Sequence, residues 1–95
     1  MAGGELITKS LLFKGKQLQI NFSSSAAGGI RVEIQDQQGK PIPGFTKSDC
    51  EDIYGDAIDR VVSWKGRSDL APLAASPVRL RFLLEDVDLY AFRFQ

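Results

Sequence analysis

The sequence predicts an all-β protein, an antiparallel two-sheet β-sandwich of jelly-roll-like form with one or two single-turn helices. Three observations support this fold class: apolar and polar residues alternate in several short segments, Gly- and Pro-containing turns separate these segments, and no strand–helix–strand repeat of useful length occurs. A chain of 95 residues is long enough for one small core. We therefore assign residues 5–95 to a single domain and interpret residues 1–4 (Met-Ala-Gly-Gly) as a start and linker remnant.

The C-terminal segment has the clearest alternation. Apolar residues occupy every second position from Val78 to Leu84 and again from Tyr90 to Phe94. A period of two places such residues on one face of a strand, where a core can cover them. The residues between the two runs, 86–88, suit a turn, so we expect an antiparallel hairpin that ends at the last residue.

Further strands are expected upstream. Residues 5–8 form a short candidate strand, which 11–13 can extend or repeat, and 60–64 is another. Segments 18–22 and 30–34 alternate cleanly, as half-buried strands do. The small polar segment 23–29 is interpreted as a loop. Pro41 and Pro43 favour an extended edge segment, because neither proline can donate to a strand ladder. Two packed sheets would bury the apolar faces of these strands together.

Two short helices are expected between the strands. Ser48 followed three residues later by Glu51 has the form of a capping box and predicts one helical turn over residues 49–53. Ser68 can cap a second turn over residues 69–74, with Asp69 at its positive end.

Composition excludes several classes of function. Twelve basic residues balance twelve acidic ones, so the chain lacks the basic face that nucleic-acid binding needs and the cationic helix that binds anionic membranes. We find no apolar run of membrane-spanning length and no secretion signal. The chain contains no histidine, which removes the commonest general base and the usual zinc sites. Its one cysteine, Cys50, is expected to be a small buried apolar residue.

Acidic residues cluster in the middle of the chain. Residues 49–59 contain several carboxylates and no lysine or arginine. Oxygen ligands of this kind suit a hard cation such as Ca²⁺, although the spacing differs from that of an EF-hand loop. The candidate metal ligands are Asp49, Glu51, Asp52 and Asp56. The alternative is a solvated, helix-capping loop, in which case no cofactor is expected.

A carboxylate pair at the C-terminal turn is the remaining catalytic candidate. Asp86 and Asp88 have the spacing of two acids that flank a tight turn. Glycoside hydrolysis needs two acids across a cleft, one of them with a raised pKa, and a solvated turn cannot provide the burial that raises it. A domain of this size has little material left to form a cleft, so we expect no enzymatic activity.

A candidate ligand site surrounds Trp64. An apolar floor with a few polar anchors is typical of a small-molecule site, and a sugar ring can lie on an aromatic face. The candidate contact residues are Trp64, Tyr54, Lys65, Arg67 and Asp69. The alternative is that Trp64, in phase with Val62, packs in the core.

Polar side chains are expected on the outward strand faces. The arginines are Arg31, Arg79, Arg81 and Arg93, which can share a face with Gln17, Gln19, Glu33 and Glu85. Cross-strand pairs of opposite charge would make this a solvated sheet surface. A docking face for a neighbouring domain and a flat platform for glycan are the alternatives.

Several runs of residues carry a resemblance to a known module. They are Arg31–Asp36, Gly39–Phe45, Val62–Trp64, Pro77–Phe82 and Asp88–Phe94. Together they resemble a small β-sandwich module at the C-terminal end of bacterial multidomain proteins similar to glycoside hydrolases of the levanase and invertase β-propeller type. The resemblance covers nearly the whole chain, from residue 4 to residue 94. It implies a non-catalytic accessory domain of a secreted or cell-envelope parent protein.

Two functions are compatible with this resemblance. The first is an accessory module that binds carbohydrate weakly. The second is a structural module that docks to and stabilises an adjacent catalytic domain and has no soluble ligand. They differ in the place of Trp64, which contacts ligand in the first and packs in the core in the second.

Overall fold

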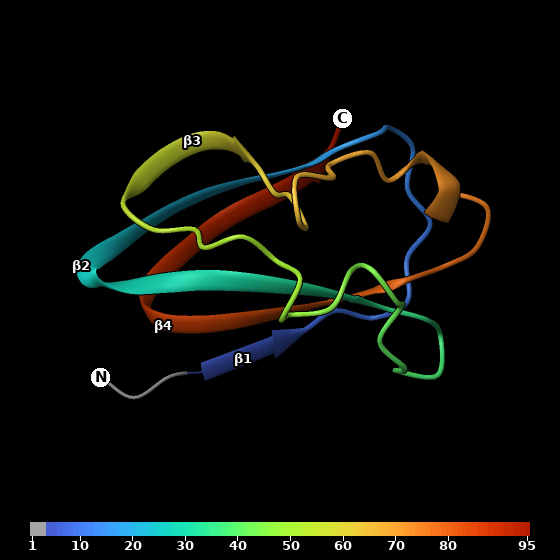
Figure 1. Ribbon diagram of the computed structural model, residues 1–95, viewed down its shortest axis with the longest axis horizontal. Coiled ribbons are helices and arrows are strands. Elements are labelled where there is room, and N and C mark those ends of the chain that lie inside the picture. Colours follow the sequence, from blue (N-terminus) through green and yellow to red (C-terminus); the bar gives the residue numbers. More distant parts are fainter. Residues whose placement is uncertain (1–3) are drawn as a thin grey trace.

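The computed structural model describes residues 4–95, which form one antiparallel sheet and a short 3₁₀-helix (Figure 1). The elements are β1 (Gly4–Ile7), β2 (Leu18–Gln35), β3 (Asp56–Val61), η1 (Ala71–Leu73) and β4 (Arg79–Phe94). The strand order is β1-β4-β2-β3, and every neighbouring pair is antiparallel. The all-β prediction is confirmed. The linker interpretation of residues 1–4 lies outside the described residues except at Gly4, which begins β1.

The long strands β2 and β4 bend, and the sheet folds over on itself (Figure 1). Pairing between the two strands is interrupted between Ser24 and Gly29, where the register shifts. The paired segments are 18–24 with 87–94 and 29–35 with 79–85. One hydrogen-bonded sheet therefore supplies both layers around the core, where two separate sheets were expected.

Two predicted interruptions are part of continuous strands. Segment 23–29 belongs to β2 and is no loop. Residues 86–88 belong to β4, in which Asp86 has a φ of 49°. The predicted hairpin is therefore wrong, because each half of β4 pairs with β2 and not with the other half. A bend and a turn need the same small or polar residues, so composition did not distinguish them.

Consecutive serines fix the bend of β2. Ser23 Oγ donates to Asp56 Oδ1 at 2.8 Å, and Ser25 Oγ donates to Asp86. Ser24 Oγ accepts a backbone N–H bond of 2.7 Å from the residue that precedes β3. Short stretches of β3 and β4 are thereby tied to the same three residues of β2.

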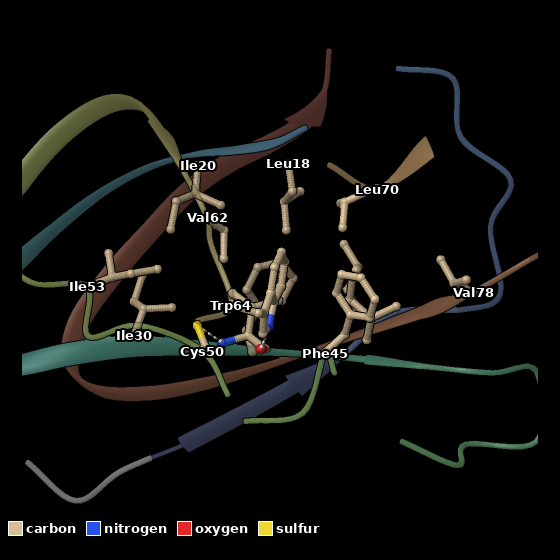
Figure 2. Packing of buried hydrophobic residues seen from close by; sticks show 14 of the residues in the cluster. Leu18, Ile20, Ile30, Phe45, Cys50, Ile53, Val62, Trp64, Leu70 and Val78 are labelled. Carbon is tan, nitrogen blue, oxygen red and sulfur yellow. Dashed lines mark hydrogen bonds between the residues drawn. The ribbon is translucent and has the colours of Figure 1, made fainter. Parts of the chain in front are cut away.

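The core lies between the two halves of the folded sheet (Figure 2). The predicted inward positions are confirmed for β2 and for the first part of β4 with the preceding residue, where the buried apolar residues are Leu18, Ile20, Phe22, Ile30, Val32, Ile34, Val78, Leu80 and Phe82. In the second half of β4, Phe92 and Phe94 are only half-buried. Tyr90 was expected inside and is 69% exposed. Two consecutive residues of β2 pair with Ala91 and Leu89, so Tyr90 is the extra residue of a bulge. The bulge resets the alternation and turns Tyr90 to solvent.

The helical predictions are only partly matched. Residues 49–53 form no helix, and Cys50 and Ile53 make isolated β-bridges instead. The second expected turn is the 3₁₀-helix η1, and Asp69, not Ser68, accepts a bond at its start, from the N–H of Ala71 at 3.0 Å. The predicted strand 60–64 is matched only at its start, because β3 ends at Val61 and Trp64 makes isolated β-bridges. Among residues 4–95, no helix has the length and apolar character needed to cross a membrane.

Candidate functional site

Trp64 packs in the core (Figure 2). Its side chain is 1% exposed, and its indole N–H donates to the backbone oxygen of Val32 at 2.8 Å. Its ring meets the edge of Phe45, with 5.5 Å between the ring centroids. This burial favours the core alternative for Trp64, because a buried ring offers no face to a ligand.

Lys65 and Arg67 follow Trp64 in a tight turn that Trp64 begins. The φ of Lys65 is 50° and that of the following glycine is 79°, as in a type I′ turn. Lys65 Nζ lies 3.2 Å from Asp49 Oδ1. The guanidinium carbon of Arg67 lies 5.6 Å from the centroid of the Phe45 ring, within cation–π distance. The charged groups of Lys65 and Arg67 therefore contact other side chains of the protein, Asp49 and Phe45.

Asp69 and Tyr54 lie elsewhere. Asp69 accepts a backbone bond at the start of η1. Tyr54 is 66% exposed and lines a groove that none of the other four candidate contact residues lines. The five predicted contact residues are therefore not gathered into one site.

Asp49 and Glu51 are held by nearby hydroxyl groups. The hydroxyl of Thr46, at 2.9 Å, and then Lys65 lower the pKa of Asp49. The hydroxyl of Ser63, at 2.5 Å, and then a backbone N–H lower the pKa of Glu51. Both carboxylates thus stabilise the loop that carries them.

Asp52 and Asp56 face two other elements. Asp52 Oδ1 accepts from Arg31 on β2 at 2.6 Å, and Asp56 accepts from Ser23 at the bend. Within residues 4–95 no three potential metal-ligating side chains come together. The four predicted cation ligands therefore do not converge, since Asp49 and Glu51 bond the turn at residues 63–66, Asp52 bonds β2 and Asp56 bonds the bend.

Three of the four outward arginines make ion pairs on the sheet surface, whereas Arg79 makes none and its buried Nε has no hydrogen-bond partner among the described residues. The ion pairs are Arg31 with Asp52, Arg81 with Glu5 and Glu33, and Arg93 with Asp59. The fold of the sheet separates them, because Arg31 and Arg81 lie on one half and Arg93 on the other. They therefore do not form one continuous platform.

Glu33 is a buried carboxylate that sequence reasoning placed on a solvated face. It is 3% exposed and accepts hydrogen bonds from Gln35 Nε2 at 2.9 Å, Arg81 Nη1 at 3.3 Å and the backbone N–H of Lys47 at 3.4 Å. Burial raises the pKa of Glu33, but these hydrogen bonds outweigh it and leave the pKa below its ordinary value. The outward direction was predicted correctly, and the loop that carries Lys47 covers it.

Glu33→Gln is expected to lower the free energy of unfolding near pH 7 by about 1–2 kcal/mol, because the hydrogen-bonded charge is lost. A carboxylate with a lowered pKa stabilises the fold above its ordinary value of 4.5 and loses this contribution as the pH falls through its folded-state pKa. Urea unfolding at several pH values should therefore show a shallower acid decline for the variant than for the wild type. Glu5→Gln, which removes an exposed partner of Arg81, is the control and should cost less than about 1 kcal/mol. Equal acid slopes for wild type and Glu33→Gln would contradict the assignment.

A groove of about 860 Å³ lies at the bend of the sheet, and we call it the bend groove. Its lining residues are Gly4, Glu5, Ala26–Arg31, Asp52–Tyr54 and Leu83–Glu85. Apolar and glycine residues of β2 and β4 contribute much of this surface. The charged contributors are the paired Arg31 and Asp52 together with Glu5 and Glu85. Tyr54 adds an exposed aromatic ring.

A second hollow, of about 760 Å³, lies beside β3 and the Tyr90 bulge. Ile58 is 83% exposed here, and the neighbouring Asp59 has a φ of 57°. The backbone N–H of Asp59 donates to Asn21 Oδ1 at 2.6 Å. This irregular pairing on both sides of Asn21 presents Ile58 and Tyr90 to solvent.

The remaining candidates, Cys50, Asp86 and Asp88, lie outside both hollows. Cys50 is free and buried, as expected, and burial raises the pKa of its thiol. Asp86 and Asp88 lie within β4, and neither lines the bend groove or the second hollow. Asp86 instead accepts from Ser25 at the bend.

Comparison with protein-family models, with curated proteins and with solved structures finds no match to this chain. The resemblance to a levanase-associated module therefore stays a prediction. The function has to be inferred from the grooves, the exposed rings and the edges of the sheet.

Proposed function

We propose that this chain is a non-catalytic accessory module of a carbohydrate-active protein and that it binds glycan weakly in the bend groove. In this proposal the folded sheet serves as a small jelly-roll-like sandwich, and the parent protein is secreted or part of the cell envelope. The observation that carries the proposal is the exposed ring of Tyr54 in a groove with both apolar and charged lining residues.

The chemistry of a sugar suits these groups. The C–H face of a pyranose or furanose ring can stack on Tyr54, while its hydroxyl groups can bond to carboxylates and a guanidinium. Arg31 and Asp52 already pair at 2.6 Å, so a neutral ligand would leave both charges balanced. A single aromatic ring with few anchors gives little surplus over the entropy lost on binding, which makes weak affinity the expectation.

Tyr54→Ala is expected to abolish glycan binding without unfolding the domain, because the ring is largely outside the core. The wild type is first applied to a glycan array with and without calcium, and the best ligand is then titrated by calorimetry. Tyr90→Ala is the matched control, since Tyr90 is 69% exposed but lies outside the bend groove. Binding that survives Tyr54→Ala, or an array with no signal at all, would count against the proposal.

A structural module that docks to a neighbouring catalytic domain is the second candidate. The exposed pair Ile58 and Tyr90 favours it, because an aromatic and a large aliphatic side chain in a hollow are typical anchors of protein interfaces. Burial of Trp64 also fits this candidate. An empty glycan array together with an intact fold would support docking over glycan binding.

A further inference from the structure

The two halves of the folded sheet differ in whether a strand lies beside β4 on the side away from β2. One half has β1 beside the first half of β4, whereas the second half of β4 has no further strand on that side. Phe82 and Phe92 lie 5.3 Å apart between ring centroids, so the two halves of β4 face each other across the core. The layer opposite β1 therefore lacks one strand among residues 4–95.

Backbone groups along this side of β4 are unpaired. Gln17 and Gln95 exchange both of their backbone hydrogen bonds. Hydrogen-bonded and non-hydrogen-bonded pairs alternate along antiparallel strands, so Phe94 and Phe92 direct their N–H and C=O groups away from β2. No backbone partner from residues 4–95 meets them there. We call this side of residues 87–94 the open edge.

Apolar side chains beside the open edge are incompletely covered. Leu89, Phe92 and Phe94 pack against the core but stay partly exposed. Leu6 of β1 pairs with the fully buried Phe82 and so faces the same side of the sheet, yet it is 46% exposed. A strand placed beside β4 would cover both groups, because it would lie directly opposite β1.

One acidic side chain on the open edge has no ion-pair partner among residues 4–95. Asp88 is exposed and makes no ion pair within the described chain. Arg93, which lies on the same outer face, bonds instead to Gln19 of β2 at 3.2 Å and to Asp59 of β3 at 3.3 Å. The carboxylate of Asp88 therefore lies on the outer face beside the empty strand position, and no cation of the described residues pairs with it.

We propose that the open edge binds an extended segment of a partner protein by strand addition. The segment carries apolar residues at every second position, which cover Leu6 and Phe92, and lysine or arginine between them, which pairs with Asp88. The vacant position is one strand wide. If two copies of this chain paired through their open edges, the β1 strand of one copy would meet the β1 strand of the other in the opposite layer. A separate extended segment therefore fits the vacant position better. This inference does not depend on glycan binding at the bend groove.

Amide exchange measured by NMR tests the proposal with a capped octapeptide that alternates valine with lysine and threonine. Saturable binding is expected below about 1 mM, with exchange of the Phe92 and Phe94 amides slowed about tenfold or more. A peptide with glutamate in place of lysine should bind several times more weakly, because it repels Asp88. No change at these amides up to about 1 mM, or protection located on β1 or β3 instead, overturns the proposal.

Two matched variants locate the contact. Leu6→Lys places a charge in the vacant position and should abolish peptide binding, since an inward charge blocks strand addition. Ile7→Lys is the control, because Ile7 is 47% exposed on the opposite face of β1 and should leave binding unchanged. Equal loss in both variants overturns the proposal. Self-association in light scattering that Leu6→Lys alone removes also overturns it, since a second copy would then be the occupant.

Discussion

Trp64→Ala is expected to lower the free energy of unfolding by about 3–5 kcal/mol, the largest effect of any single substitution considered for this chain. The indole is 1% exposed, contacts Phe45 and occupies the centre of the cluster in Figure 2. Its removal leaves a cavity and an unpaired carbonyl oxygen on Val32, because the indole N–H bond of 2.8 Å is lost as well. Urea unfolding followed by circular dichroism measures the difference.

Trp64→Phe is the matched control. It keeps an aromatic ring against Phe45 and loses the hydrogen bond to Val32, so a smaller loss of about 1–3 kcal/mol is expected. Emission of the wild-type indole should be blue-shifted and protected from acrylamide, since water does not reach the ring. A solvent-exposed emission spectrum, or an alanine variant as stable as the wild type, would contradict the core position of Trp64.

Strand positions were the part of the fold that local pattern could predict. Apolar and polar residues alternate strictly in 18–22, 30–34 and 78–82, and the apolar set of each segment is buried, as the geometry of any strand leads one to expect. Glu33 is the exception among the polar set, because a loop covers it. The edge strand β1 was also found, although all of its residues are exposed. A period of two indicates which residues share a face of a strand, and this was enough to predict most of the buried apolar residues of the strands.

The connection between strands could not be predicted from the same pattern. Segment 23–29 is rich in Ser, Ala and Gly, as loops are, but here the small residues let two strands bend together. Asp86 adopts a positive φ within β4, which local sequence presents as a turn. The Tyr90 bulge depends on pairing with β2, and no local pattern encodes which residue of a partner strand is skipped.

The candidate site was limited by the same lack of long-range information. Closely spaced carboxylates such as Asp49 and Asp52 were candidate ligands, but each turns to a partner that is close only in the folded chain. Trp64 is in phase with Val62, and this spacing indicated the core position that Trp64 occupies. Tyr54, one of the candidate contact residues, is exposed, whereas the bend groove beside it arises only when β2 and β4 fold over.

Gly28→Ala is expected to lower the free energy of unfolding by about 3 kcal/mol, because the bend has no room for a Cβ atom at this position. A Cβ on Gly28 would overlap the backbone carbonyl oxygens of Glu85 and Asp86. These atoms belong to the paired strand and cannot move away as a flexible side chain would. The cost therefore appears as a displacement of β2 from β4 at the bend, next to the pair of Gly29 with Glu85.

Gly4→Ala is the control for the loss of glycine itself. A Cβ at Gly4 meets no atom within 4 Å, so this variant should differ from wild type by less than about 0.5 kcal/mol. Urea unfolding gives the stabilities, and amide exchange shows whether protection is lost first at the bend. If Gly28→Ala were as harmless as Gly4→Ala, the two strands could separate at the bend without cost. The sheet would then be held in its folded form by the core alone, and the close approach at Gly28 would contribute nothing to it.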